Sequence, residues 1–313
     1  MVSKKNASSG HKLGQIIGDW FEEYFAYSLL KSVADELDLF IDSRFVERNC
    51  RGKKIYWSDK DENTVDYDFV LELGGDKDKK GIPIGFFETF WRRGSRHSKD
   101  KARDDSGKLV PMRDTFPTAR FLGIISAGDF TEPAIDLVKS KSIDLFPIPK
   151  KQIIKSWERH NLSIDYADDL PEEEKSILVN NISNKLQESK ELYESISNEL
   201  ISLIGVEVLI NYKNRVKNSI SAPPLSFEIT PIYTGEKQEF LEYETILEYL
   251  KSLENSISPK LEEMEKKVIY KIIYGDGSIF IRENISINSA QELHKSVGIV
   301  QKHFKEILSQ TNY

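Results

Sequence analysis

Cysteine is almost absent from the sequence, since Cys50 stands alone and cannot form an internal disulfide. One Cys and five scattered His give none of the CxxC or HxxxH spacings typical of zinc sites. No run approaches the roughly 18 apolar residues that a membrane span needs. The opening MVSKKNASSGHK also lacks the apolar segment of a secretory signal. These absences predict a cytoplasmic protein that does not enter a membrane and has no structural zinc.

An excess of positive charge is also lacking, because the chain has 44 Lys and Arg against 51 Asp and Glu, a net charge of −7. An even distribution of this charge would repel a polyanion, so a nucleic-acid surface would have to be a local basic patch. Residues 92–103 form such a basic segment, which includes His97 and the only acid Asp100. Its cations are Arg92, Arg93, Arg96, Lys99, Lys101 and Arg103. A charge run of this kind is otherwise a solvated helix face.

Hydrophobic periodicity predicts an α/β fold in the first half of the chain. The apolar residues of 12–38 recur at helical spacing, whereas 119–128 is one continuous apolar run typical of a strand buried on both faces. The further elements expected are strands at 53–57, 66–73, 82–91 and 144–149, and helices at 98–115, 131–140 and 150–160. The order α-β-β-β-α-β-α-β indicates a mixed sheet flanked by helices.

The second half reads differently and predicts a mostly helical α+β region. Acidic residues 162–174 resemble a linker, and a long charged helix is expected over 171–205. LSFEITPIYTG is typical of a strand, and KVIYKIIYGDGSIFIREN of a β-hairpin with an Asp-Gly turn. A final amphipathic helix is expected from Ser289 to about Leu308.

Two carboxylates stand on the strands that flank the polar loop 74–81. If the turn is centred near residues 77 and 78, antiparallel pairing sets Asp68 opposite Phe87, next to Glu88. Two acids among the apolar FVL and GFF segments are costly in a core, so a cation should compensate them. Mg²⁺ is suited to this role because it prefers oxygen ligands and commonly uses one or two carboxylates with a phosphate. In the alternative, Asp68 merely ends a strand and Glu88 pairs with Arg92 or Arg93.

The stretch VDYDFVLELGG…GIPIGFFETFWRRGSRHSKDKARDDSGKLVP, followed by FLGIISAG, resembles the PD-(D/E)XK nuclease superfamily, especially type II restriction endonucleases. The resemblance covers roughly residues 12–148 and implies a restriction-endonuclease-like α-β-β-β-α-β core. It implies that Asp68 is the metal-binding acid at the start of the second strand and Glu88 the acid of the E-x-K element. Glu22, in GDWFEE, matches the further acid that many members take from the first helix. Tyr67 stands where the family often, but not always, has proline.

Phe90 stands where the family has the lysine of the E-x-K element. That lysine helps to activate the attacking water and to stabilise phosphate charge, so another cation is expected to replace it. Lys101 is the first choice, Lys99 the second and Arg92 the third, because the lysine migrates into the next helix in some members. Asp104, one turn beyond Lys101, is either a further metal contact or an exposed helix acid.

The resemblance implies an endonuclease that hydrolyses phosphodiester bonds of double-stranded DNA with Mg²⁺, for which Mn²⁺ substitutes. The residues expected to contact the DNA backbone are Arg92, Arg93, Arg96, His97, Lys99 and Arg103. Residues 1–161 would form the nuclease core, and 162–313 would serve DNA recognition, dimerisation or both. A homodimer suits two-fold DNA sites. A cognate DNA methyltransferase encoded nearby is a candidate partner.

Three alternatives stay open. A DNA-repair or junction-resolving nuclease would share the core and differ in the substrates that it cleaves. A catalytically inactive DNA-binding protein is kept open by Phe90 and would fail to bind Mg²⁺ or Mn²⁺. A helical interaction protein would explain charged helices such as 171–196, and the isolated second half would then bind no DNA.

Overall fold

The computed structural model describes residues 8–94, 98–189, 191–256 and 266–310. Contacts divide the chain into two compact units, each assembled from separate stretches. Unit 1 comprises Met1–Val33, Phe87–Gly107 and Gly123–Asn214, and unit 2 comprises Ala34–Phe86, Lys108–Leu122 and Arg215–Tyr313. Both units draw on residues before and after 161, so the contacts do not follow the two consecutive regions that the sequence suggests.

A five-stranded sheet has the strand order β1-β4-β5-β6-β7. Its strands are β1 (Phe40–Ser43), β4 (Phe69–Leu73), β5 (Ile82–Arg92), β6 (Phe121–Gly128) and β7 (Asp144–Ile148). β1 pairs antiparallel with β4, whereas β6 pairs parallel with β7, so the expected mixed sheet is confirmed. Every residue of β6 is buried, which confirms a strand covered on both faces.

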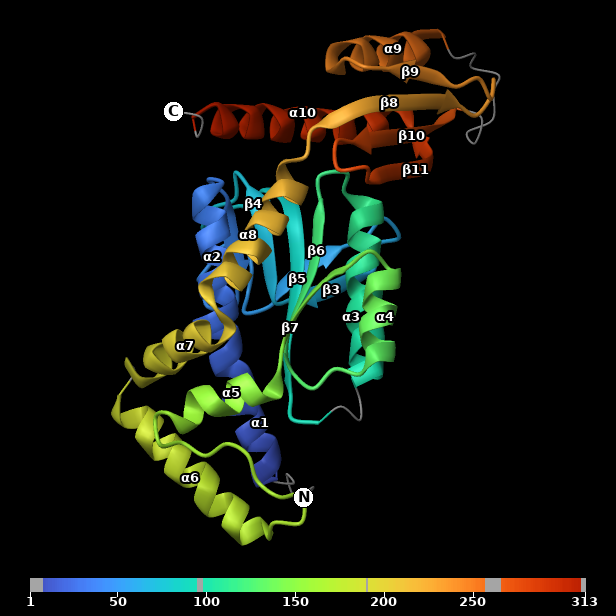
Figure 1. The fold of residues 1–313 in the computed structure, drawn as a ribbon. Coiled ribbons are helices and arrows are strands. Elements are labelled where there is room, and N and C mark those ends of the chain that lie inside the picture. The colour runs from blue at the N-terminus through green and yellow to red at the C-terminus, as the bar shows by residue number, and fades with distance from the viewer. Residues whose placement is uncertain (1–7, 95–97, 190, 257–265, 311–313) are drawn as a thin grey trace. The chain divides into compact units, whose positions relative to one another are not determined.

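Helices accompany the sheet as the periodicity predicts. The first helical stretch comprises α1 (Ser9–Trp20), the π-helical segment η1 (Phe21–Ala26) and α2 (Tyr27–Glu36). α3 (Ser98–Thr115), α4 (Glu132–Ser140) and α5 (Lys150–Glu158) follow and match the predicted ranges (Figure 1). None of the described helices is long and apolar enough to cross a bilayer.

The first strands differ from the prediction. β1 was not expected, and the segment expected at 53–57 is β2 (Ile55–Ser58), which pairs with β3 (Thr64–Tyr67) in a separate two-stranded sheet. The strand expected over 66–73 is therefore interrupted by a bend at Asp68, where the chain leaves β3 and enters β4. The interruption follows from pairing, because β3 and β4 have partners in two different sheets.

In unit 1, the helices of the second half pack on the first helix. α6 (Glu172–Glu188) contacts α1, and α7 (Glu191–Ile204) contacts both η1 and α5. Trp20 packs edge-on against Trp157 at 5.1 Å between ring centroids, and its indole N–H donates to the carbonyl of Tyr193 at 3.0 Å. α8 (Val206–Ser221) begins after Gly205, whose φ of +95° suits glycine. The predicted helix over 171–205 is thus two helices, and Tyr193 of α7 stacks on Tyr24 of η1 at 4.9 Å between ring centroids.

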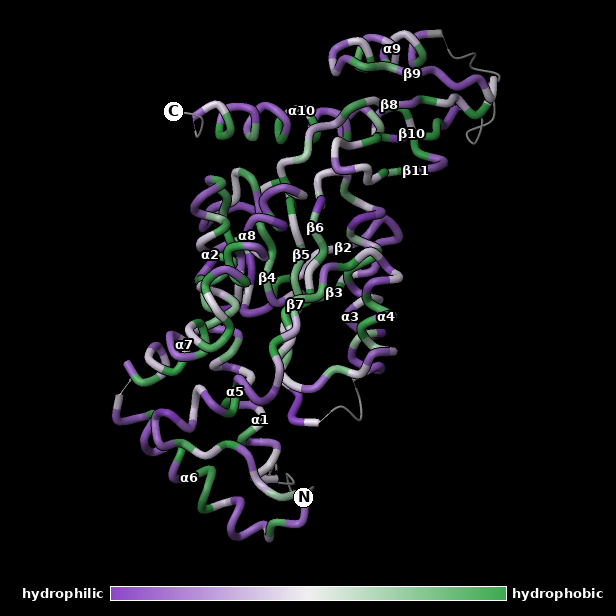
Figure 2. Tube along the Cα trace, in the orientation of Figure 1, coloured by the Kyte–Doolittle hydropathy of each residue, from purple (hydrophilic) through white to green (hydrophobic). Residues whose placement is uncertain are grey.

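In unit 2, a four-stranded sheet has the order β11-β10-β8-β9 and carries two helices. The elements are β8 (Pro224–Pro231), β9 (Gln238–Phe240), α9 (Tyr243–Ser256), β10 (Lys267–Tyr274), β11 (Ile279–Ser286) and α10 (Ile287–Gln310). The expected hairpin is confirmed as β10 and β11, with Gly277 at φ +80° in its turn. α10 alternates hydrophobic and hydrophilic residues, as an amphipathic helix should (Figure 2).

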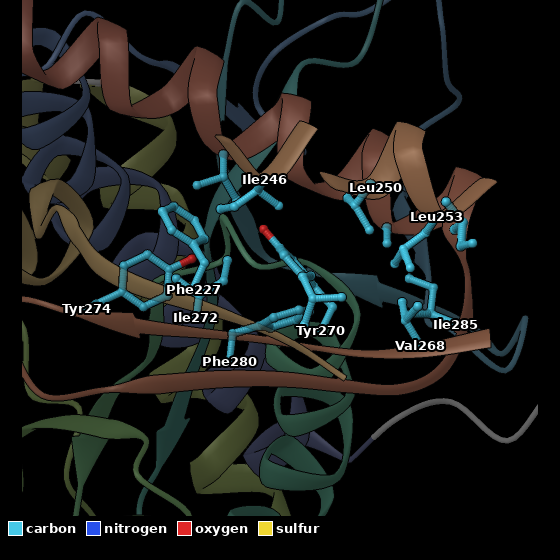
Figure 3. Packing of buried hydrophobic residues seen from close by; sticks show 14 residues of the cluster. Phe227, Ile246, Leu250, Leu253, Val268, Tyr270, Ile272, Tyr274, Phe280 and Ile285 are labelled. Atoms are coloured by element: carbon cyan, nitrogen blue, oxygen red, sulfur yellow. The ribbon is translucent and has the colours of Figure 1, made fainter. Parts of the chain in front are cut away.

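The core of this sheet lies between its strands and the two helices. Ile246, Leu250 and Leu253 of α9 lie over strand residues such as Tyr270 and Phe227 (Figure 3). Burial alternates residue by residue along β10, so one face of the sheet forms this core.

Candidate functional site

Glu88 lies in β5 within unit 1 and is only 1 % exposed. Side chains alternate between the two faces of a strand, so Glu88 and Phe90 share one face of β5 and Trp91 points to the other. A carboxylate buried in this way is costly unless a cation or hydrogen bonds compensate it. The groups on the Glu88 face of β5 therefore decide what the site can do.

Lys101 of α3 lies on that face. Its ammonium group is 5.5 Å from the ring centroid of Phe90 and donates to Oδ1 of Asp105 at 2.6 Å. The two residues of this ion pair are four apart, which places them on one side of the helix. α3 thus sets a cation beside Phe90, two positions along the strand from Glu88. This is the element from which sequence reasoning expected the replacement for the motif lysine.

Asp105 is a site residue that the sequence reasoning missed, because it chose Asp104. Asp105 is fully buried, whereas the side chain of Asp104 is 67 % exposed and lies 3.9 Å from Arg103. Asp104 thus lies where an exposed helix acid would lie, and its role as a metal contact stays a prediction. The signal that favours Asp105 is its spacing of four from Lys101, on the same helix face as the buried Leu109.

The basic segment is only partly a free cationic surface. Arg93 pairs with Asp168, lies 3.7 Å from Asp165 and stacks on Tyr166 with its guanidinium carbon 4.0 Å from the ring centroid. The partners in these three contacts come from the acidic stretch 162–174. Arg93 therefore fixes that stretch within unit 1.

The other members of the basic segment differ in exposure. Arg92, Lys99 and Arg103 are exposed, and Arg103 pairs with Asp100 at 3.3 Å on the surface of α3. Arg96 and His97 lie outside the described residues. The exposed members are the ones that remain suited to phosphate contacts.

Glu22 lies in the π-helical segment η1, and one of its carboxylate oxygens is fully buried. Short π-helical turns occur often at functional sites. One turn earlier, Gly18 lies close to Trp91, because a Cβ added to Gly18 would be 4.0 Å from the Trp91 Cβ. α1 thus approaches β5 from the face opposite to the one that Lys101 covers. The grouping of Glu22 with Glu88 stays a prediction.

Asp68 is half-buried at the bend between β3 and β4, in unit 2. β4 is the neighbour of β5 in the five-stranded sheet, as the predicted hairpin requires. The preceding residue, Tyr67, is buried and its hydroxyl donates to the carbonyl of Lys108 at 2.8 Å. Asp68 and Glu88 belong to different compact units, so their meeting in one site stays a prediction.

A pair of buried acids in unit 2, Asp42 and Glu72, serves a structural purpose. Arg48 donates to Asp42 at 2.6 Å and to Glu72 at 2.8 Å, and all three side chains are inaccessible. Arg51 also pairs with Asp42, at 2.5 Å. Burial lowers the pKa of Arg48, but its bonds to Glu72 and Asp42 outweigh burial, so the net shift is upward and the guanidinium stays charged. Two guanidinium groups thus compensate this pair of carboxylates.

Within the described residues, no three His, Cys, Asp or Glu side chains are grouped as a metal site would require. The sequence expects Asp68 and Glu88 to hold Mg²⁺, with Glu22 and Asp104 as further metal contacts, and no three of these acids form such a group among the described residues. A site with two carboxylates would leave its other ligand positions to water and phosphate. A buried carboxylate such as Glu88 has the oxygen chemistry that this ion prefers. The chain matches no family model, no curated protein and no solved structure.

Proposed function

We propose that the chain is a Mg²⁺-dependent endonuclease of the PD-(D/E)XK type and that it hydrolyses phosphodiester bonds of double-stranded DNA. One observation carries the proposal: the ammonium of Lys101 lies 5.5 Å from the ring of Phe90, which occupies the motif lysine position. With Phe90 in place of the motif lysine, the element Glu88-Thr89-Phe90 needs a cation from elsewhere in order to be active, and the next helix would supply it. Glu88 is the buried acid of that same element.

The order of elements supports the proposal. With β2 and β3 set aside as an inserted pair, α1, β1, β4, β5, α3 and β6 follow the order α-β-β-β-α-β. The acid of the second core strand would then be Asp68, directly before β4, and the E-x-F element would lie in the third strand, β5. These are the strand positions at which the superfamily carries its two metal-binding acids.

The chain's own residues would divide the chemistry between them. Glu88 and Asp68 would hold Mg²⁺, which supplies an activated water and neutralises charge on the scissile phosphate. Lys101 would stabilise the charge that develops on the phosphate oxygens, and Asp105 would hold the ammonium in place. The exposed Arg92, Lys99 and Arg103 would contact neighbouring phosphates. Action as a restriction enzyme would further call for a homodimer and a cognate methyltransferase.

Isosteric amides at the two acids test the proposal. Glu88→Gln and Asp68→Asn remove negative charge with little change in volume, so each should abolish Mg²⁺-dependent cleavage while the DNA dissociation constant changes little. Asp104→Asn is the matched control, because it removes one exposed acid of α3 and should leave cleavage unchanged. A folded Glu88→Gln protein that cleaves at the wild-type rate would refute the assignment. Cleavage of branched DNA in strong preference to linear duplex would identify a junction-resolving enzyme instead.

A further inference from the structure

Unit 2 contains a cavity of about 230 Å³ that the proposed nuclease chemistry does not use. Its walls come from residues 117–120 before β6, residues 220–224 where α8 ends and β8 begins, Tyr274 at the end of β10, and one side of α10. The lining is mostly apolar and includes Pro117, Pro223, Val300 and Phe304. Pockets for drug-sized ligands measure roughly 300–1,000 Å³, so this cavity suits a smaller molecule.

The charged side chain of Arg120 lines this apolar cavity and is buried. The guanidinium of Arg120 stacks on Tyr274, with its central carbon 3.4 Å from the ring centroid, and donates from Nη2 to Asp276 at 2.8 Å. The side chain is only 7 % exposed. Its Nε–H is buried, and among the described residues it meets no hydrogen-bond acceptor. A buried donor without an acceptor is unfavourable, so a ligand with an acceptor atom at this position would be stabilised.

Neighbouring polar groups do not meet this need. The hydroxyl of Tyr274 donates to the carbonyl of Pro117 at 2.6 Å, and the hydroxyl of Thr118 donates to the carbonyl of Pro83 at 2.8 Å. Burial raises the pKa of Tyr274, so that hydroxyl stays protonated. Both hydroxyls are thus committed as donors to backbone carbonyls. Neither hydroxyl group accepts from the Nε–H of Arg120, which keeps its need for an acceptor.

We propose that this cavity binds a small apolar monocarboxylate, such as a short fatty acid or an aromatic acid. The apolar walls would take the hydrocarbon part, and a carboxylate oxygen would accept from the Nε–H of Arg120. Lys305 of α10 lines the same cavity and is exposed. Asp276 offsets the charge of Arg120, so the ammonium of Lys305 leaves the lining with an excess of one positive charge. This excess favours an anion over a neutral alcohol or an amine.

Calorimetric titration of the full chain with hexanoate tests the proposal, with hexanol and hexylamine as matched probes of the same chain length. Hexanoate should bind, hexanol should bind at least tenfold more weakly, and hexylamine should not bind. Lys305→Met changes an exposed side chain and should weaken hexanoate binding several-fold while hexanol is unaffected. Equal binding of all three probes would overturn the carboxylate assignment. Absence of binding by hexanoate would mean that the Nε–H is satisfied by water alone.

Filling the cavity provides an independent test of the site. Val300 faces the cavity, whereas its neighbour Ile299 is 55 % exposed on the outer side of α10. Val300→Trp should abolish hexanoate binding, and Ile299→Trp, which adds a ring of the same size, should leave it intact. Unchanged binding to a folded Val300→Trp protein would place the site elsewhere. If Val300→Trp does not fold, the loss with Lys305→Met decides the question.

Discussion

Acidification is expected to destabilise unit 2 through His294. Its ring is fully buried in the core of the four-stranded sheet, where Nδ1 lies 2.8 Å from the hydroxyl of Tyr270 and Nε2 2.9 Å from the carbonyl of Tyr243. A neutral ring satisfies both contacts, because Nε2–H donates to Tyr243 and Nδ1 accepts from Tyr270. Burial lowers the pKa of His294 from 6.5 to about 4, against smaller opposing effects of the Tyr243 bond and Glu244.

The size of the effect follows from linkage between protonation and unfolding. His294 has a lower pKa in the folded state than in the unfolded state, so its stabilisation is complete above about pH 6.5 and is lost as the pH falls toward about 4. One pKa unit is worth about 1.4 kcal/mol, so the loss should reach roughly 2 kcal/mol near pH 5 and about 3 kcal/mol at lower pH.

Urea unfolding of the wild type and of His294→Gln measures this effect. Gln offers a donor and an acceptor but does not titrate, so the stability difference between the two proteins should shrink by roughly 2 kcal/mol between about pH 7 and about pH 5. Carboxylates elsewhere titrate in both proteins and cancel in this comparison. Parallel stability curves for the two proteins would show that His294 is not the buried neutral group described above.

Three further predictions concern cations. Lys101→Ala should slow single-turnover cleavage by orders of magnitude at nearly unchanged DNA affinity, whereas Lys99→Ala should chiefly weaken DNA binding. Near-normal cleavage by Lys101→Ala together with slow cleavage by Lys99→Ala would move the catalytic cation to Lys99. Arg48→Met should lower the free energy of urea unfolding by about 3–5 kcal/mol, because it leaves the buried Glu72 without its guanidinium partner and leaves Asp42 with Arg51 alone, and a loss below about 1 kcal/mol would contradict this. Arg92→Ala should flatten the dependence of log DNA affinity on log salt, whereas Arg93→Ala should not, since acidic residues already engage Arg93; equal slopes would contradict the distinction.

Periodicity and turn chemistry predict much of the fold. The β10–β11 hairpin and α10 follow from the sequence, because the hairpin has alternating apolar residues and an Asp-Gly turn and α10 has a regular apolar repeat. The bounds of α3 also match the predicted range, although its sequence is mostly polar. β1 could not be found in this way, since its four residues, FIDS, show no alternation and include the buried Asp42. That acid tolerates burial only because Arg48 and Arg51, six and nine residues further along the chain, reach it from a loop, and no periodic pattern reports such ion pairs.

The candidate site is predictable only in part for the same reason. The position of Glu88 on its strand face follows from the period of two, and the reach of Lys101 toward Phe90 follows from the start of α3 at Ser98. The engagement of Arg93 by residues 165–168 depends on how distant segments pack, and no local pattern reports it. Each unit is also assembled from separate stretches of the chain, which contact one another although they are far apart in the sequence.

The central claim is that Glu88 and Lys101 belong to an active nuclease site. The most direct measurement is the conversion of supercoiled plasmid by the purified full chain, with Mg²⁺, with EDTA, and with Mg²⁺ added back after EDTA. We expect linear or nicked DNA with Mg²⁺, none with EDTA, recovery on addition of Mg²⁺, and no conversion by Glu88→Gln under any of these conditions. Conversion that persists in EDTA, or that Glu88→Gln retains in full, would contradict the central claim.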